Sequence, residues 1–286
     1  MHGFRRALFP FRALARLLLT ATIASSPAAG QDLATLLPLP SAPLESLHHH
    51  EDGLHFSHPL VAESPSPDTK IRMDLTRSQL PGRAGTRHTI LFEGEYAFTR
   101  SVSVEVDVPF TRLDPSNALN SNHLDTVGAA LKYANFALEK EGLLLGGGIE
   151  LGLPTGDEAR GIGSDEVIEV EPFLDFGLQR GPWEVVGFSR FGFPTHEDVN
   201  QADLEWSWNL SLLYHLTPAV SPLAELDGTS ISGGTEGGLQ TINASLGLKV
   251  APTGDPDFQV GLAVRKSLRT EREFNTEILL AVFFHF

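Results

Sequence analysis

Five histidines lie within eleven residues in the N-terminal part of the chain, and together they could bind a metal ion. They are His48, His49, His50, His55 and His58. Two carboxylates, Glu51 and Asp52, directly follow the first three. Neutral imidazoles and carboxylates at this density suit zinc, copper or nickel. The pattern favours a solvated histidine-rich tether with no dedicated ion, and we expect no cofactor. The alternative is a divalent transition metal bound at this cluster.

The segment that carries these histidines is predicted to be an extended arm or linker. Proline occurs six times between residues 31 and 68, and Ser and Ala fill much of the remainder. Proline has no backbone N–H to donate and interrupts both helices and strands. We assign residues 31–69 to a Pro/His-rich periplasmic arm.

Residues 1–30 have the order of a secretory signal peptide. Four arginines and no acidic residue come first, an apolar stretch covers residues 17–24, and small residues end the segment. Its removal takes the formal net charge from −15 to −19. Binding to nucleic acid needs clustered Lys and Arg, so this acidic chain is not expected to bind it. The absence of cysteine excludes disulfides and thiolate sites.

From residue 70 onward, apolar and polar residues alternate with the two-residue period of β-strands. Gly, Pro, Asn and Asp separate the alternating runs, and helical periodicity is absent. We predict twelve strands, at residues 70–78, 86–98, 102–111, 123–137, 142–153, 166–178, 182–193, 203–216, 219–227, 239–250, 257–267 and 273–286.

The last predicted strand has one wholly apolar face and ends on Phe286. This ending resembles the C-terminal signature of bacterial outer-membrane β-barrels. The resemblance implies two partners, the lipid of the outer membrane and the barrel assembly machinery that receives this strand. The expected location is the outer membrane of a Gram-negative bacterium, after removal of the signal peptide.

Lipid can cover apolar rows, but it offers no partner to backbone N–H and C=O groups. Only a closed sheet is therefore permitted there. Twelve is an even number, and the strand lengths match the ~9–11 residues that cross a bilayer at a tilt. Predicted connections also alternate between short and long. We predict an all-β, antiparallel, up-and-down transmembrane barrel over residues 70–286. The alternative is a soluble β-sandwich, which would show the same alternation of residues.

The polar faces of these strands would line the lumen of the barrel. The hypothetical lumen-lining residues are Glu93, Glu95, Glu105, Asp107, Lys132, Glu150, Glu205, Asn209, His215, Lys249, Arg265 and Glu277. The same face also receives Glu169, Glu171, Asp175, Glu225 and His285, although the facing of 166–178 is ambiguous. An excess of carboxylates favours cations or neutral solutes over anions. Alternatively, these charges pair across the lumen and hold it shut.

Two short motifs add a family resemblance. The sequences Gly-Leu-Pro-Thr-Gly-Asp at 152–157 and Ala-Pro-Thr-Gly-Asp at 251–255, with Gly-rich strands and the terminal Phe, resemble the outer-membrane family named for the MetA pathway of phenol degradation. The resemblance covers roughly residues 70–286. It implies a transporter-like barrel for aromatic or other hydrophobic compounds, and no catalytic residue carries over.

The preferred function is therefore passive passage of small solutes, with no enzymatic activity. The sequence has no Gly-rich phosphate loop with a Lys, so nucleotide use is not expected. Two alternatives remain. One is an outer-membrane lipid hydrolase that uses a histidine with a nearby carboxylate. Its candidates are His123, His196, His215, Asp125, Asp198 and Glu205. The other is a structural barrel whose histidine-rich arm binds metal.

Overall fold

The computed structural model describes residues 53–195, 202–235 and 237–286. All of them belong to one compact unit, Leu44–Phe286. The predicted signal peptide, the first part of the arm, and His48, His49, His50 and His196 lie outside the described residues.

Thirteen strands make up the described fold. Their bounds are β1 Lys70–Gln79, β2 Gly85–Thr99, β3 Val102–Pro115, β4 Ser121–Leu124, β5 Val127–Asn135, β6 Leu143–Leu153, β7 Glu169–Arg180, β8 Trp183–Pro194, β9 Leu204–Tyr214, β10 Val220–Ser232, β11 Gln240–Val250, β12 Phe258–Ser267 and β13 Thr276–His285. Three short 3-10 helices lie in connections, namely η2 Pro81–Arg83, η3 Glu139–Glu141 and η4 Glu158–Arg160. Among the described residues, no helix has the length and apolar character needed to cross a membrane.

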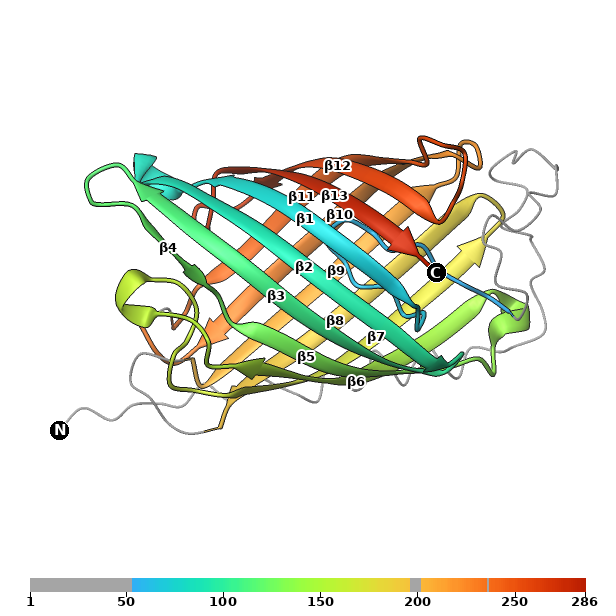
Figure 1. Cartoon of the computed structure of the whole chain (residues 1–286), viewed down its shortest axis with the longest axis horizontal. Helices are drawn as coiled ribbons and strands as arrows, with labels where there is room; N and C mark the ends of the chain where they lie inside the picture. Colours follow the sequence, from blue (N-terminus) through green and yellow to red (C-terminus); the bar gives the residue numbers. More distant parts are fainter. Residues whose placement is uncertain (1–52, 196–201, 236) are drawn as a thin grey trace, which may run out of the picture. The chain divides into compact units, whose positions relative to one another are not determined.

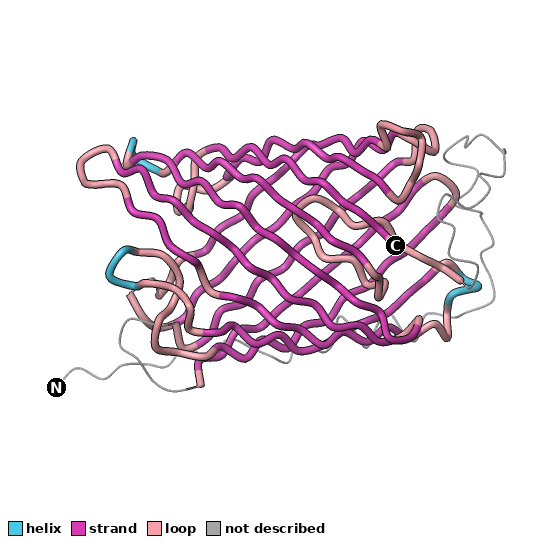
Figure 2. The backbone as a smooth tube through the Cα atoms, viewed as in Figure 1, coloured by secondary structure: helices cyan, strands magenta, loops and turns pink. Residues whose placement is uncertain are grey.

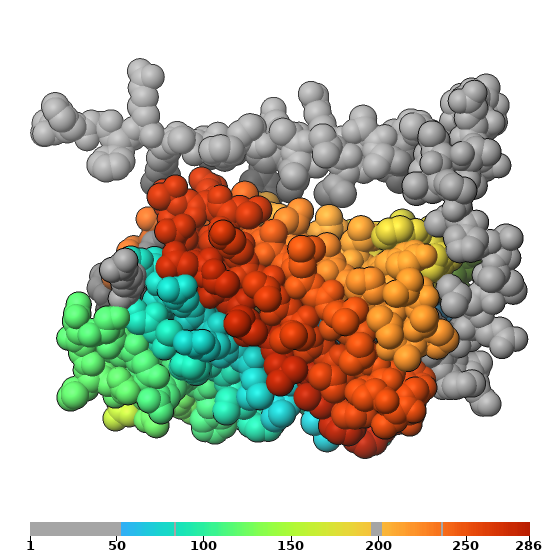
Figure 3. Space-filling model, turned by 90° about the horizontal axis from the view of Figure 1, so that it is seen from above, coloured from blue at the N-terminus to red at the C-terminus, as the bar shows by residue number. Residues whose placement is uncertain are grey.

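The strands close into a single antiparallel barrel, as Figure 1 shows. Apart from β4 and β5, which do not pair with each other, each strand pairs with its neighbours in the chain, and β1 pairs with both β2 and β13. In the space-filling view of Figure 3, β13 (red) and β1 (teal) accordingly lie side by side in the wall. Strands β4 and β5 both pair with β3, and together they occupy one of the twelve strand positions of the barrel. The predicted closed barrel of twelve strands is confirmed.

Three predicted strand boundaries are wrong for identifiable reasons. The segment 123–137 is broken at residues 125–126, where the Thr155 side chain accepts from the backbone N–H of Val127 and donates to the carbonyl of Asp125. The strands predicted at 102–111 and 219–227 continue to Pro115 and Ser232. Their added residues keep ladder pairs, such as Thr229 with Thr241, beyond the apolar rows from which the bounds were predicted.

The connections divide the barrel into two unlike ends. The short-turn end carries the connections 100–101, 136–142, 181–182, 215–219 and 251–257. The long-loop end carries 80–84, 116–120, 154–168, 195–203, 233–239 and 268–275. The two Pro-Thr-Gly-Asp corners, at 154–157 and 252–255, therefore lie at opposite ends and are not equivalent positions of a repeat.

The outer face of the wall carries exposed apolar side chains on every strand except the short β4. Exposed apolar side chains on it include Ile71, Phe92, Leu131, Leu174, Leu210, Leu246 and Ile278. Exposed aromatic rings occur near both ends, with Tyr96, Phe98, Phe284 and Phe286 near the short-turn end and Phe110, Phe193 and Trp206 near the other. These rows point away from the barrel and not toward a second sheet, which excludes the sandwich. An apolar outer face with aromatic residues near both ends is what a barrel wall in contact with membrane hydrocarbon requires.

We predict that Leu246→Arg destabilises the folded barrel in a bilayer by about 2–4 kcal/mol, because its side chain, 72% exposed near the middle of β11, would place a charge in hydrocarbon. Urea unfolding in phosphatidylcholine vesicles measures this change. The control is Leu119→Arg, at a side chain 93% exposed in a loop of the long-loop end. Equal effects of the two substitutions would contradict a lipid-facing β11.

Candidate functional site

The inner face of the barrel is polar and strongly charged. All twelve residues proposed as lumen-lining lie on the face opposite the exposed apolar rows. Eight of them are buried, namely Glu93, Glu95, Glu105, Lys132, Asn209, His215, Lys249 and Glu277. The other four, Asp107, Glu150, Glu205 and Arg265, are partly buried. The structure thus gathers side chains from most strands around one interior.

Residues 53–69, which we name the plug, lie inside this interior. Figure 2 shows the segment as a loop within the barrel that enters at the short-turn end and returns there to begin β1. Eleven of the thirteen residues from Phe56 to Asp68 are buried, and the exceptions are Val61 and Glu63. The described part of the predicted arm is therefore enclosed by the barrel wall.

Two apolar side chains anchor the plug to the wall. Phe56 packs against Ala134, Leu144 and Val186. Its ring lies over Gly177, where an added Cβ would come within 2.6 Å of a ring carbon. Leu60 packs in a second cluster, beside Gly261, where an added Cβ would lie 2.2 Å from a methyl of Leu60. Glycine at these two wall positions provides the space that the plug fills.

Charged wall residues bind the backbone of the plug. Glu184 accepts from the N–H of Ser57 at 2.7 Å. Glu225 accepts from the N–H groups of Val61 and Ala62, at 3.1 and 3.2 Å. Two cations also bind the plug: Arg72 donates to the carbonyl of Leu60, and Lys249 donates to the carbonyl of His58. Five backbone groups of a segment without regular secondary structure thereby have hydrogen-bond partners.

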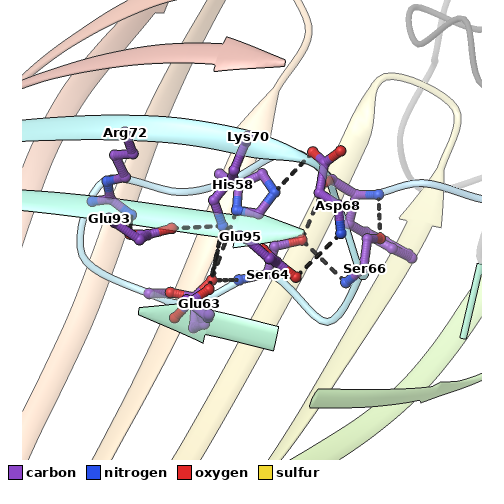
Figure 4. A network of polar contacts seen from close by, with 12 residues as sticks. His58, Glu63, Ser64, Ser66, Asp68, Lys70, Arg72, Glu93 and Glu95 are labelled. Carbon is purple, nitrogen blue, oxygen red and sulfur yellow. Dashed lines mark hydrogen bonds and ion pairs between the residues drawn. The ribbon is translucent and has the colours of Figure 1, made fainter. Parts of the chain in front are cut away.

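A buried ionic network joins the plug to the wall, as Figure 4 shows. Lys70 Nζ lies 2.6 Å from Glu93 and 2.7 Å from Glu95. Lys132 Nζ lies 3.4 Å from both Glu95 and Glu105. The plug contributes Glu63, whose Oε1 lies 3.2 Å from Lys132 Nζ and 3.6 Å from Lys70 Nζ. Four carboxylates thus surround two ammonium groups, and all except Glu63 come from the wall.

The histidines of the candidate metal cluster divide into two groups. His48, His49 and His50 lie outside the described residues. His55 and His58 lie in the plug, close to Asp68 and to His285 of β13. Burial and the nearby Lys70 ammonium lower the pKa of His58 to about 4, so this imidazole is neutral at neutral pH.

The long-loop end of the lumen opens into a vestibule of about 530 Å³. Its lining includes Glu158, Glu169 and Glu205. Below it, Arg190 lies 2.9 Å from Glu150 and 2.8 Å from Glu171. These ion pairs join nearby strands of the wall, and the vestibule beside them keeps an acidic lining.

Several wall residues that contact the plug or its network were not in the predicted set. They are Lys70, Arg72, Asp74 and Glu184, and Glu225 was placed only on the inner face. The alternation at 70, 72 and 74 was a sufficient signal for the first three. The alternation could not predict that these residues contact the plug, because a two-residue period shows which face of the sheet a side chain lies on and not what fills the space beside that face.

A hydrogen-bonded chain of Ser221, His215 and Glu184, of which the last two are buried, resembles a hydrolytic triad in composition only. His215 Nδ1 lies 3.0 Å from Ser221 Oγ, and its Nε2 lies 3.0 Å from Glu184 Oε2. This is the reverse of the usual ring order, in which Nε2 faces the serine. The adjoining cavity measures about 20 Å³, and Glu184 also holds the plug. The arrangement positions the plug and leaves no room for a lipid ester.

No family model matches this chain, and no curated protein matches it. Solved structures do resemble it in fold. One is the COG4313 outer membrane channel from Pseudomonas putida F1, with a TM-score of 0.61 at 16% identity over 77% of this chain and 96% of that chain. Another is the NanC porin, with a TM-score of 0.54 at 10% identity over 76% of this chain and 98% of that chain. Membership in the MetA-pathway family stays a prediction.

We predict that Lys132→Met destabilises the protein by about 3–5 kcal/mol, because it leaves Glu63, Glu95 and Glu105 without one of their two buried cations. Urea unfolding in detergent micelles, followed by tryptophan fluorescence, measures the loss. The matched control is Lys140→Met in the exposed η3 turn. Indistinguishable midpoints for the two variants would show that the network contributes nothing to stability.

Proposed function

We propose that this protein is an outer-membrane channel that lets small solutes pass without an energy source. The observation that carries the proposal is the closed barrel itself, apolar outside and charged inside. A wall of that kind separates hydrocarbon from a polar interior. The likeness to a channel and a porin supports it. A signal peptide at 1–30 would deliver the chain to this membrane.

In this proposal the plug is the gate. It occupies the lumen at the short-turn end, and its contacts to the wall are noncovalent. Further along the same strands, side-chain polar atoms of Asp175 and Asn209 are buried without a hydrogen-bond partner among the described residues. Buried polar groups of this kind are normally hydrated. Displacing the plug would join this polar space to the short-turn end.

The solutes we propose are small cations and small neutral molecules. Glu158, Glu169 and Glu205 line the vestibule, and a ring of carboxylates attracts cations and repels anions. Hydrophobic or aromatic solutes are what the family resemblance implies. The charged inner wall offers them little apolar surface, so we place them second.

A lipid hydrolase is not favoured as an alternative. His123 and His215 lie at opposite ends of the barrel, in β4 and directly after β9. The ring of His123 contacts the carbonyl of Leu124 at 2.8 Å, and His215 belongs to the plug site. The described residues therefore bring no predicted histidine to the lipid-facing surface with a serine and a carboxylate.

We predict that the double variant Gly177→Leu/Gly261→Leu raises the open probability in planar bilayers. The added side chains would occupy the positions of Phe56 and Leu60 and expel the plug from its anchors. Single-channel recording compares this variant with the wild type.

The matched control is Gly94→Leu, at an outward-facing position where an added Cβ meets nothing within 4 Å. Wild-type recordings should show brief or small openings, and the control should reproduce them. Silence of the double variant, with the barrel shown to be folded by its resistance to detergent at room temperature, would refute the channel.

We also predict that Glu169→Gln/Glu205→Gln lowers the preference for cations, because both carboxylates line the vestibule. The measurement is the reversal potential in a salt gradient, recorded on the plug-displaced background. It should move toward the value for chloride. The control is Glu271→Gln, at an exposed position in the loop before β13. An unchanged reversal potential would contradict an acidic selectivity region at this mouth.

A further inference from the structure

Three imidazoles surround one carboxylate oxygen where the plug meets the end of the barrel wall. Asp68 Oδ2 lies 3.4 Å from His55 Nε2, 3.3 Å from His58 Nε2 and 2.6 Å from His285 Nδ1. Asp68 and His58 have side chains 1% and 0% exposed. Side chains of this kind rarely gather in a buried place without an organising charge.

The spacing fits a metal ion. Nitrogen and oxygen ligands lie about 2.0–2.2 Å from zinc, so two ligand atoms of a tetrahedral site are roughly 3.4 Å apart. The separations of Asp68 Oδ2 from the two plug histidines already have this value. Ligand atoms of His55, His58 and Asp68 all lie within 4.8 Å of one another.

A second observation also indicates a ligand. His58 is fully buried, yet neither of its ring nitrogens makes a hydrogen bond within the described part of the chain. Its Nε2 faces Asp68, and its Nδ1 lies 3.7 Å from Glu63 Oε1. Histidines that bind metal commonly direct the other ring nitrogen toward a carboxylate.

The site is also reachable. A cavity of about 350 Å³ at the short-turn end is lined by Gly53, His55, Asp68 and Thr69, among others. Ions that reach that end would therefore meet His55 and Asp68 first. A coordination position not filled by these residues could be taken by water from this cavity.

We propose that His55, His58 and Asp68 bind one divalent transition metal ion of the zinc class, with His285 holding Asp68 in place. His55 and His58 lie on the entering leg of the plug, and Asp68 lies on its returning leg, two residues before β1. The ion therefore fastens the two legs together beside the junction of β1 and β13. On the proposed function, it locks the gate in its seated position.

Isothermal titration of the full-length protein in detergent with Zn²⁺ tests the site. We expect one equivalent to bind at micromolar affinity or tighter. His58→Gln should abolish this binding, and His285→Gln should weaken it about tenfold as an outer partner. Co²⁺ absorption of the wild type should show four-coordinate bands, and His58→Gln should lose them.

Two controls separate this site from other histidines. The triple variant His48→Gln/His49→Gln/His50→Gln should keep the single tight equivalent, and so should His123→Gln at the opposite end. Folding of each variant is checked by its electrophoretic shift on heating. Equal Zn²⁺ affinity in wild type and His58→Gln, or loss of the tight equivalent only in the triple variant, would overturn the site.

The effect on the gate is measured separately. Zn²⁺ added to the side of the short-turn end should lower the open probability of the wild type and leave His58→Gln unaffected. Tight Zn²⁺ binding by calorimetry with no conductance in any variant would keep the metal site and reject the channel. Conductance that Zn²⁺ does not change, together with tight binding, would reject the lock.

Discussion

Satisfaction of backbone hydrogen bonds is the constraint on which this structure depends. Hydrocarbon has no partner for N–H and C=O groups, so every strand must pair on both sides. The pairing of β1 with β13, in register from Lys70 with His285 to Gln79 with Thr276, removes the last free edge. Once the sheet is closed, its two-residue period gives each strand one lipid face and one lumen face. The charged interior follows from the closure.

That interior creates a second requirement, because charges withdrawn from water need partners. The wall meets part of it with pairs between nearby strands, such as Arg265 with Glu277 at 2.9 Å. The plug meets another part. Glu63 adds a carboxylate between Lys70 and Lys132, and Glu184 and Glu225 accept backbone N–H groups of the plug. The same wall charges thus serve a short irregular segment as its binding site.

The sequence was sufficient for the wall and insufficient for its contents. The alternation of apolar and polar residues predicted all twelve strand positions of the barrel. It also predicted the correct face for residues such as Glu95 and Lys249, because every second side chain of a strand faces the lipid. It could not show where residues 53–69 lie, because a Pro-rich segment has no period. The alternation also did not predict the break at residues 125–126. That break depends on Thr155, which lies in a distant loop, and the sequence of the broken segment contains no sign of this contact. The signal peptide at 1–30 stays a prediction.

The way the plug is held suits the gating role that we propose for it. Fixing one backbone residue costs about 1–2 kcal/mol, and burying a Phe or Leu side chain gains about 1.5–3 kcal/mol. Phe56 and Leu60 therefore offset the ordering of only a few residues of the plug. The rest depends on hydrogen bonds to charged wall residues, each of which contributes about 1.5–3 kcal/mol net of its exchange with water. The backbone hydrogen bonds between strands cannot be replaced in this way, because hydrocarbon offers no hydrogen-bond partner. Displacing the plug, whose contacts water can replace, therefore costs less per residue than opening the wall, and the proposed metal ion would add a further contact between its two legs.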